Sequence, residues 1–199
     1  MPTTWVDTVL RRARNSVEVF PYPHQASFFL DNPLRRALTK PGEVVDTIGL
    51  RGHQAVLELG PGPGTFSVEL ARRLSTGRLD LLDVQPEMLD KARRKLERAG
   101  LSNVDFHVGE ASAGIPFPDN MFDAAFLAAV IGEVPDQRGC LRELARIIKP
   151  GGVLVFHEGL PDPDRLSVSD LRALAEPAGF TLVDARGSRW RDIVRFERS

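Results

Sequence analysis

Short apolar segments alternate with helix-patterned segments from Gln54 to the end of the chain, and this alternation restricts the fold most strongly. The candidate strands span residues 55–59, 78–83, 104–108, 122–130, 153–157, 180–185 and 190–196, and the candidate helices span 65–74, 86–99, 136–148 and 168–178. Nearly continuous apolar strands between helices indicate a parallel sheet that is covered on both faces. We therefore expect a doubly wound α/β domain with a seven-stranded, mostly parallel sheet.

The last two candidate strands are joined by a link of only four residues, 186–189. A parallel crossover needs a dozen or more residues, so this pair should form an antiparallel hairpin at the C-terminus. Before the alternating part, residues 1–50 predict a separate, mainly helical segment, with one helix beginning at Asn32-Pro33 and a short one at Pro41.

Composition excludes several classes of protein. A formal net charge of −1 provides no overall field for nucleic acid or an anionic membrane. The longest apolar run, residues 124–131, is far shorter than the roughly 20 residues that span a bilayer. The single cysteine, Cys140, excludes an intramolecular disulfide and fits a cytoplasmic protein, and the four histidines show no metal-ligand spacing. We therefore expect no metal and no membrane association.

A glycine-rich turn follows the first strand and opens the first helix of the alternating part. Glu58 is followed by Gly60, Gly62 and Gly64 at every second position. Glycines allow a sharp turn and the close approach of a ligand, whereas a simple turn needs only one. A dinucleotide fingerprint has glycine at its first, third and sixth positions, but the sixth position here is Thr65. With a carboxylate at the strand end, the turn favours a zwitterionic amino-acid group over a pyrophosphate.

An acidic residue at the end of the second strand is the expected partner of this turn. Asp83 stands immediately before the loop that leads to the helix at Pro86. A carboxylate there can accept hydrogen bonds from both ribose hydroxyls of an adenosine ligand. Asp80 competes for this role, and Asp83 is preferred because of its place at the strand end.

Five segments in order resemble class I S-adenosylmethionine (SAM)-dependent methyltransferases over roughly residues 53–199. The first is the glycine turn, the second is Asp83-Val84-Gln85-Pro86-Glu87-Met88-Leu89, and the third is Gly109-Glu110-Ala111 followed by Ile115-Pro116-Phe117. The fourth is Phe122-Asp123-Ala124-Ala125, and the fifth is the segment 141–152, which ends in Lys149-Pro150-Gly151-Gly152. The subgroup that the chain resembles contains the ubiquinone and menaquinone C-methyltransferases.

This resemblance implies a Rossmann-like methyltransferase fold for residues 51–199, with SAM as cofactor and S-adenosylhomocysteine as product. Gly60 and Gly62 would lie under the methionine moiety, Glu58 would lie near its amino group, and Asp83 would hold the ribose. Gly64 would complete the cofactor-binding turn. The remaining cofactor-binding residues that it implies are Gln85, Met88, Glu110 and Ala111 around the adenine and Ala128 beside the sulfonium.

A methyl acceptor can also require a general base. The candidates are His24, Glu133 and His157, with Tyr22 and Glu158 as further options. Glu133 follows the fourth strand and His157 ends the fifth, whereas His24 lies in the N-terminal segment. The sequence leaves the choice among them open.

The leading hypothesis is a methyltransferase that acts on a small molecule by in-line displacement, as a monomer or homodimer. One alternative is a methyltransferase acting on RNA or protein, which the small size of the chain and its near-neutral charge disfavour. Another is a non-catalytic SAM-binding partner or sensor, which the intact glycine turn and Asp83 disfavour. The N-terminal segment carries Phe20, Tyr22, Phe28 and Phe29. These aromatics should pack either onto the core or as a lid over the strand ends.

Overall fold

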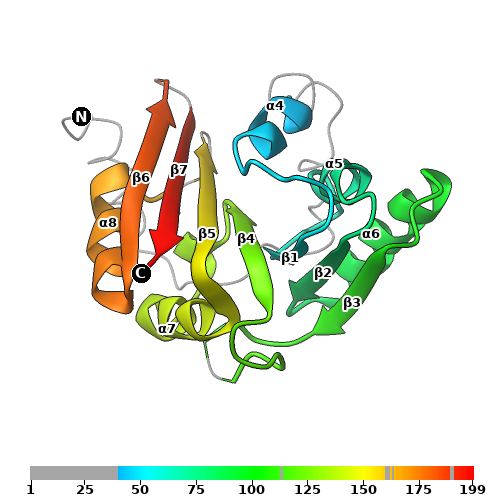
Figure 1. Ribbon diagram of the computed structural model, residues 1–199. Coiled ribbons are helices and arrows are strands. Elements are labelled where there is room, and N and C mark those ends of the chain that lie inside the picture. The colour runs from blue at the N-terminus through cyan, green and yellow to red at the C-terminus, as the bar shows by residue number, and fades with distance from the viewer. Residues whose placement is uncertain (1–39, 113, 160–161, 163, 189–190) are drawn as a thin grey trace.

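The computed structural model describes residues 40–112, 114–159, 162, 164–188 and 191–199. Its centre is a seven-stranded sheet with the strand order β3-β2-β1-β4-β5-β7-β6 (Figure 1). The strands are β1 (Ala55–Leu59), β2 (Arg78–Asp83), β3 (Val104–Val108), β4 (Phe122–Ala128), β5 (Ile148–Gly159), β6 (Phe180–Gly187) and β7 (Arg191–Arg198). The predicted doubly wound α/β fold is confirmed.

The sheet is parallel from β3 to β5, and its last two strands break that pattern. β6 and β7 form the predicted antiparallel hairpin. β7 also pairs antiparallel with β5, so the hairpin inserts its second strand between β5 and β6. In Figure 1 the arrow of β7 accordingly points opposite to that of β6. The short link predicted the hairpin but not which of its strands would join the parallel sheet.

Helices cover both faces of the sheet. On one face lie α4 (Pro41–Asp46), α5 (Ser67–Arg73) and α6 (Pro86–Arg98), and on the other lie α7 (Gln137–Ile147) and α8 (Val168–Ala175). Figure 1 shows α5 and α6 beside the β1–β3 half of the sheet, and α7 and α8 beside the β5–β6 half. Short 3-10 helices, η2 (Ile131–Glu133) and η3 (Glu176–Ala178), follow β4 and α8.

Alternate residues of each central strand enter two separate cores. Val56 and Phe126 pack with the α4–α6 helices, whereas Leu57 and Leu127 pack with α7 and α8. All four side chains are completely buried. This period of two explains why the central strands are apolar at nearly every position.

Several strand boundaries differ from the prediction by a few residues, and two of the differences have a clear structural cause. β4 ends at Ala128 rather than at residue 130, because Ala129 adopts a left-handed φ of 55° that an extended strand cannot continue. β5 begins at Ile148 rather than at residue 153. Its register with β4 shifts, so Ile148 pairs with Phe122 and Val153 with Ala124. The Pro150-Gly151-Gly152 segment therefore forms an irregularity inside the strand instead of separating it from α7.

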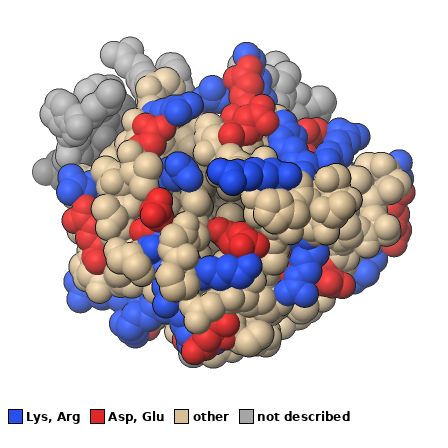
Figure 2. Space-filling view, viewed as in Figure 1, with Lys and Arg blue, Asp and Glu red and all other residues tan. Residues whose placement is uncertain are grey.

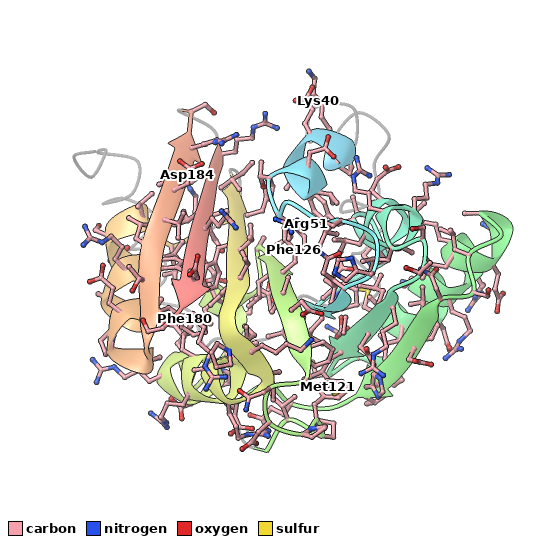
Figure 3. All side chains as sticks on the ribbon, viewed as in Figure 1. Lys40, Arg51, Met121, Phe126, Phe180 and Asp184 are labelled. Carbon is pink, nitrogen blue, oxygen red and sulfur yellow. The ribbon has the colours of Figure 1, made fainter. Side chains whose placement is uncertain are left out.

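The carboxyl ends of the parallel strands share one edge of the sheet. In Figure 3, Met121 at the beginning of β4 and Phe180 at the beginning of β6 both lie at the opposite, lower edge. The segments that follow β1, β2, β4 and β5 consequently meet at the upper edge, where open α/β folds bind their ligands. Within the described ranges, no helix is both long and apolar enough to cross a bilayer.

Candidate cofactor and active site

The three glycines of the turn after β1 all have left-handed φ values, 63° at Gly60, 52° at Gly62 and 77° at Gly64. Only glycine adopts this conformation without strain. Their surroundings nevertheless differ. A Cβ on Gly60 would lie 2.5 Å from a methyl carbon of Val130, and one on Gly64 would lie 3.0 Å from Ala92 of α6. These two glycines therefore allow close packing inside the protein.

Gly62 faces open space instead. Apart from its two chain neighbours, no atom of the described residues would lie within 4 Å of a Cβ built on it. Its backbone N–H donates to Oδ2 of Asp83 at 3.3 Å, so the turn and the end of β2 are in direct contact. The middle of the turn thus provides an open surface with a carboxylate beside it, which is the arrangement that a ligand with hydroxyl groups requires.

Asp83 is held in place by backbone donors. Its Oδ1 accepts from the N–H of Gln85 at 2.9 Å, and only 8% of the residue is exposed. Burial raises the pKa of Asp83, and the N–H groups of Gln85 and Gly62 oppose this rise. The carboxylate is therefore oriented by the β2–α6 loop and by the glycine turn together.

Asp80, the competing residue, has other partners. It lies inside β2, where one carboxylate oxygen is 2.9 Å from Nε2 of His107 and the other is 3.3 Å from Nε of Arg78. It is 2% exposed and does not contact the glycine turn through any bond that the structure records. The geometry thus supports the preference for Asp83 at the cofactor edge.

Glu58 lies beneath the turn rather than beside the open space. Its Oε2 accepts a 2.5 Å hydrogen bond from Oγ of Ser67, in the first turn of α5. Burial raises the pKa of Glu58 to about 8; the charge of Asp83 adds to this rise, while Ser67 and Lys95 oppose it. A contact with an amino group would therefore run through the backbone or a water. Sequence reasoning missed Ser67, because its contact with Glu58 depends on how α5 packs against β1.

The residues expected around the adenine gather beside Asp83. Gln85 caps the N-terminus of α6, and Met88 is buried in the first turn of that helix. Ala111 is buried against the α7 side of the sheet, whereas Glu110 is exposed and accepts a hydrogen bond from Ser112. Gly109, which precedes them, donates its N–H to the carbonyl of Asp83 at 3.1 Å.

The ends of β4 and β5 bring Ala128 and His157 together. These two residues are register partners, and Ala129 donates its N–H to the carbonyl of His157 at 2.9 Å. The His157 ring is 5.3 Å from the ring of Phe66, which directly follows the glycine turn and Thr65. Among the predicted bases, His157 therefore has a side chain that packs against Phe66, two residues after the last glycine of the turn. Phe66 was not singled out from the sequence.

The other two predicted bases lie elsewhere or outside the description. Glu133 ends η2 and donates its N–H to the carbonyl of Val130 at 2.9 Å. It is thus near Val130, which packs against Gly60. His24 falls within residues 1–39, outside the described residues.

Two surface hollows are lined by other residues than the glycines of the turn and Asp83. One, of about 520 Å³, is lined by residues of α4, α5 and α6, including Arg72 and Arg98. The other, of about 440 Å³, lies between the start of α7 and Leu174 of α8. Neither contains Asp83 or Gly62, so the cofactor edge is identified by its residues and not by these hollows. Within the described ranges, no group of three or more metal-ligating side chains occurs.

Comparison with known proteins identifies a methyltransferase domain in this chain. Residues 56–152 match a family described as a methyltransferase domain. The ubiquinone/menaquinone biosynthesis C-methyltransferase UbiE of Enterobacter sp. (strain 638) is 36% identical over 124 residues, which cover 60% of this chain and 49% of UbiE. The chain thus spans about half the length of the curated relatives that it matches.

Solved structures agree with the sequence match. A SAM-dependent methyltransferase from Aquifex aeolicus superposes with a TM-score of 0.82 at 27% identity, covering 90% of this chain and all of that one. The [4+2]-cyclase SpnF superposes with a TM-score of 0.72 at 19% identity, covering 97% of this chain and 92% of that one, which shows a shared fold.

The fold is that of a Rossmann-like methyltransferase, and the glycine turn with its aspartate lies at the edge where such open α/β folds bind their ligands. More narrowly, the chain carries a class I SAM-dependent methyltransferase domain and resembles the UbiE C-methyltransferases. SAM is the cofactor of this class, and the open surface at Gly62 beside Asp83 fits it.

Proposed function

We propose that this protein transfers the methyl group of SAM to a small-molecule acceptor by in-line displacement, in the cytoplasm. The observation that carries the proposal is the unfilled space above Gly62, with the Asp83 carboxylate at its side, at the edge where the parallel strands end. The resemblance to C-methyltransferases named for quinone biosynthesis supports an acceptor of small size.

In this proposal the residues of the edge share the cofactor. Asp83 holds the ribose hydroxyls, while Gly60 and Gly62 border the methionine moiety and Gly64 fixes the turn against α6. Glu58 serves the amino group through the backbone or a water. The adenine lies among Gln85, Met88, Glu110 and Ala111, and Ala128 lies beside the sulfonium.

SAM supplies an already activated methyl group when bound, so the protein has little covalent chemistry to perform. Its residues must align the acceptor with the methyl group and exclude water. The wall formed by Phe66, Phe126 and Ala128 suits the second task, because its two aromatic rings pack 5.1 Å apart beside the strand ends. We propose His157 as the first candidate to receive an acceptor proton, because it adjoins this wall. Glu133 and His24 are the other candidates.

The surface charge favours a small acceptor over RNA. On the face shown in Figure 2, basic and acidic side chains are interspersed, and no single-sign patch extends over it. The surroundings of β7 illustrate the mixture. Its Arg191 approaches Glu43, and its Asp192 pairs with Arg165. Recognition of a nucleic-acid backbone rests on clustered positive charge.

Methyl transfer can be tested without a known acceptor. Protein incubated with methyl-labelled SAM and a fractionated metabolite extract should place label in a small organic molecule and release S-adenosylhomocysteine. Label recovered only in added RNA or protein would overturn the small-molecule assignment. SAM binding without transfer to any fraction would favour the non-catalytic alternative. Gly62→Val protein serves as the control for transfer of labelled methyl groups that does not depend on the cofactor site.

The N-terminal segment enters this proposal as a lid. Its aromatic residues and His24 lie in residues 1–39, outside the described residues, and we propose that they cover the strand ends and shape the acceptor pocket. In the same assay, a chain beginning at Asp31 should bind SAM more weakly and lose methyl transfer while remaining folded. Full transfer by the shortened chain would contradict a lid.

A further inference from the structure

Glu158 is a buried carboxyl group at the end of β5 that no predicted cofactor contact uses. The residue is 1% exposed. Its Oε2 accepts a hydrogen bond from the N–H of Leu166 at 3.2 Å, and its Oε1 is buried with no hydrogen-bond partner among the described residues. Leu166 lies at the end of the connection from β5 to α8, so this bond ties the far end of the connection back to the strand.

The charges around Glu158 favour its neutral form. Asp192 is its register partner on β7 and forms an ion pair with Arg165, whose side chain is 10% exposed. Asp162 adds a third carboxylate, and Arg165 acts on Glu158 with the opposite charge. Burial, reinforced by Asp162 and Asp192, raises the pKa of Glu158 to about 8, and the Leu166 N–H and Arg165 only partly oppose this. At neutral pH the group can therefore accept the Leu166 N–H without adding a buried charge.

The β5–α8 connection also contacts the segment that follows β4. A Cβ on Gly132 would lie 2.0 Å from the carbonyl oxygen of Asp164, so the two backbones meet with no room for a side chain. Gly132 precedes Glu133 in η2. Because β4 and β5 end at the same edge, the position of one connection restricts the other.

We propose that Glu158 is a positioning residue that holds residues 164–166 before α8 and, through Asp164 and Gly132, the segment carrying Glu133. The effect of this anchoring on acceptor binding rests on the proposed function, since Glu133 borders the acceptor only if methyl transfer occurs at this edge. The anchoring itself can be measured without SAM or acceptor.

Amide hydrogen exchange of the full chain tests this role. The pKa of Glu158 is about 8 when the connection is closed and returns toward 4.5 when it opens. The state in which Leu166 is bonded to Glu158 is therefore fully favoured below about pH 4.5, and it becomes less favoured as the pH rises to about 8. The protection factor of the Leu166 N–H, corrected for intrinsic exchange, should fall up to about tenfold per pH unit between pH 5.5 and 7.5.

Variants separate positioning from simple packing. Glu158→Gln keeps an acceptor that cannot ionise, so protection at Leu166 should persist and lose its pH dependence. Glu158→Ala should lower protection at Leu166 and also at residues 132–134, while amides of β2 stay unchanged. The matched control is Glu143→Gln, because Glu143 accepts the Ile115 N–H at 3.0 Å but is paired with Arg146. It should leave Leu166 unaffected.

Three results would overturn the proposal: pH-independent protection at Leu166 in the unmodified protein, equal loss of protection in the Gln and Ala variants, or unchanged protection at residues 132–134 in the Ala variant. If the Ala variant does not fold, the pH dependence of the other two proteins still decides the matter. Failure of methyl transfer alone would contradict the proposed function and leave the anchoring result standing.

Discussion

Gly62→Val should abolish measurable SAM binding, with an affinity loss on the order of a hundredfold or more. The valine side chain would enter the space above the turn, where the described residues other than its chain neighbours place no atom within 4 Å of a Cβ. In the proposed complex the cofactor occupies that space. Calorimetric titration of the variant with SAM, and separately with S-adenosylhomocysteine, measures the loss.

A second glycine provides the matched control for backbone strain. Gly62 has a φ of 52°, and Gly100 at the end of α6 has a φ of 70° with equally open surroundings. A side chain in this left-handed region costs roughly 1–2 kcal/mol. Gly100→Val should therefore lose similar stability but bind SAM normally. Near-normal SAM binding by folded Gly62→Val protein would mean that the cofactor does not approach the turn.

Asp83→Ala should weaken SAM binding by about 1–3 kcal/mol, because buried ribose hydroxyls lose a charged acceptor. Stability without ligand should change little. Removing a carboxylate whose pKa burial has raised relieves a desolvation cost, and this offsets the loss of its bonds to Gly62 and Gln85. The change in affinity is read by calorimetry and the change in stability by thermal unfolding.

Asp80 gives the opposite pattern and serves as the control for Asp83. It is also an aspartate of β2, but its partners are His107 and Arg78. Asp80→Ala should therefore leave the SAM affinity within error of the unmodified protein. If Asp80→Ala is the variant that loses SAM, then the ribose assignment belongs to Asp80.

The fold could be predicted from the sequence because local patterns decide it. Apolar strands that end at Gly60 and Asp83 predicted the order of elements, and helix signals such as Pro86 and Gly100 matched α6 closely. The differences arose where long-range pairing prevails over local preference. Insertion of β7 between β5 and β6 depends on pairing with the hydrogen-bonding edge of β5. The early start of β5 depends on its shifted register with β4.

The candidate site was predictable at its glycines and Asp83, where the backbone conformation or the strand end dictates the residue type. It was less predictable where a role depends on a tertiary neighbour. No sequence pattern joins Glu58 to Ser67, His157 to Phe66, or Glu158 to Leu166. The shared fold of the [4+2]-cyclase SpnF likewise shows that the site, and not the fold, must support the reaction.

Calorimetric titration of the unmodified protein with SAM and with NAD, at matched concentrations, tests the cofactor assignment most directly. Both ligands carry an adenosine, so an aspartate that binds ribose does not by itself distinguish them. The alternating glycines and the buried Glu58 beneath the turn favour the amino-acid moiety of SAM. We expect SAM and S-adenosylhomocysteine to bind in the micromolar range and NAD to give no measurable heat of binding. Tighter binding of NAD than of SAM would contradict the assignment of this protein as a methyltransferase.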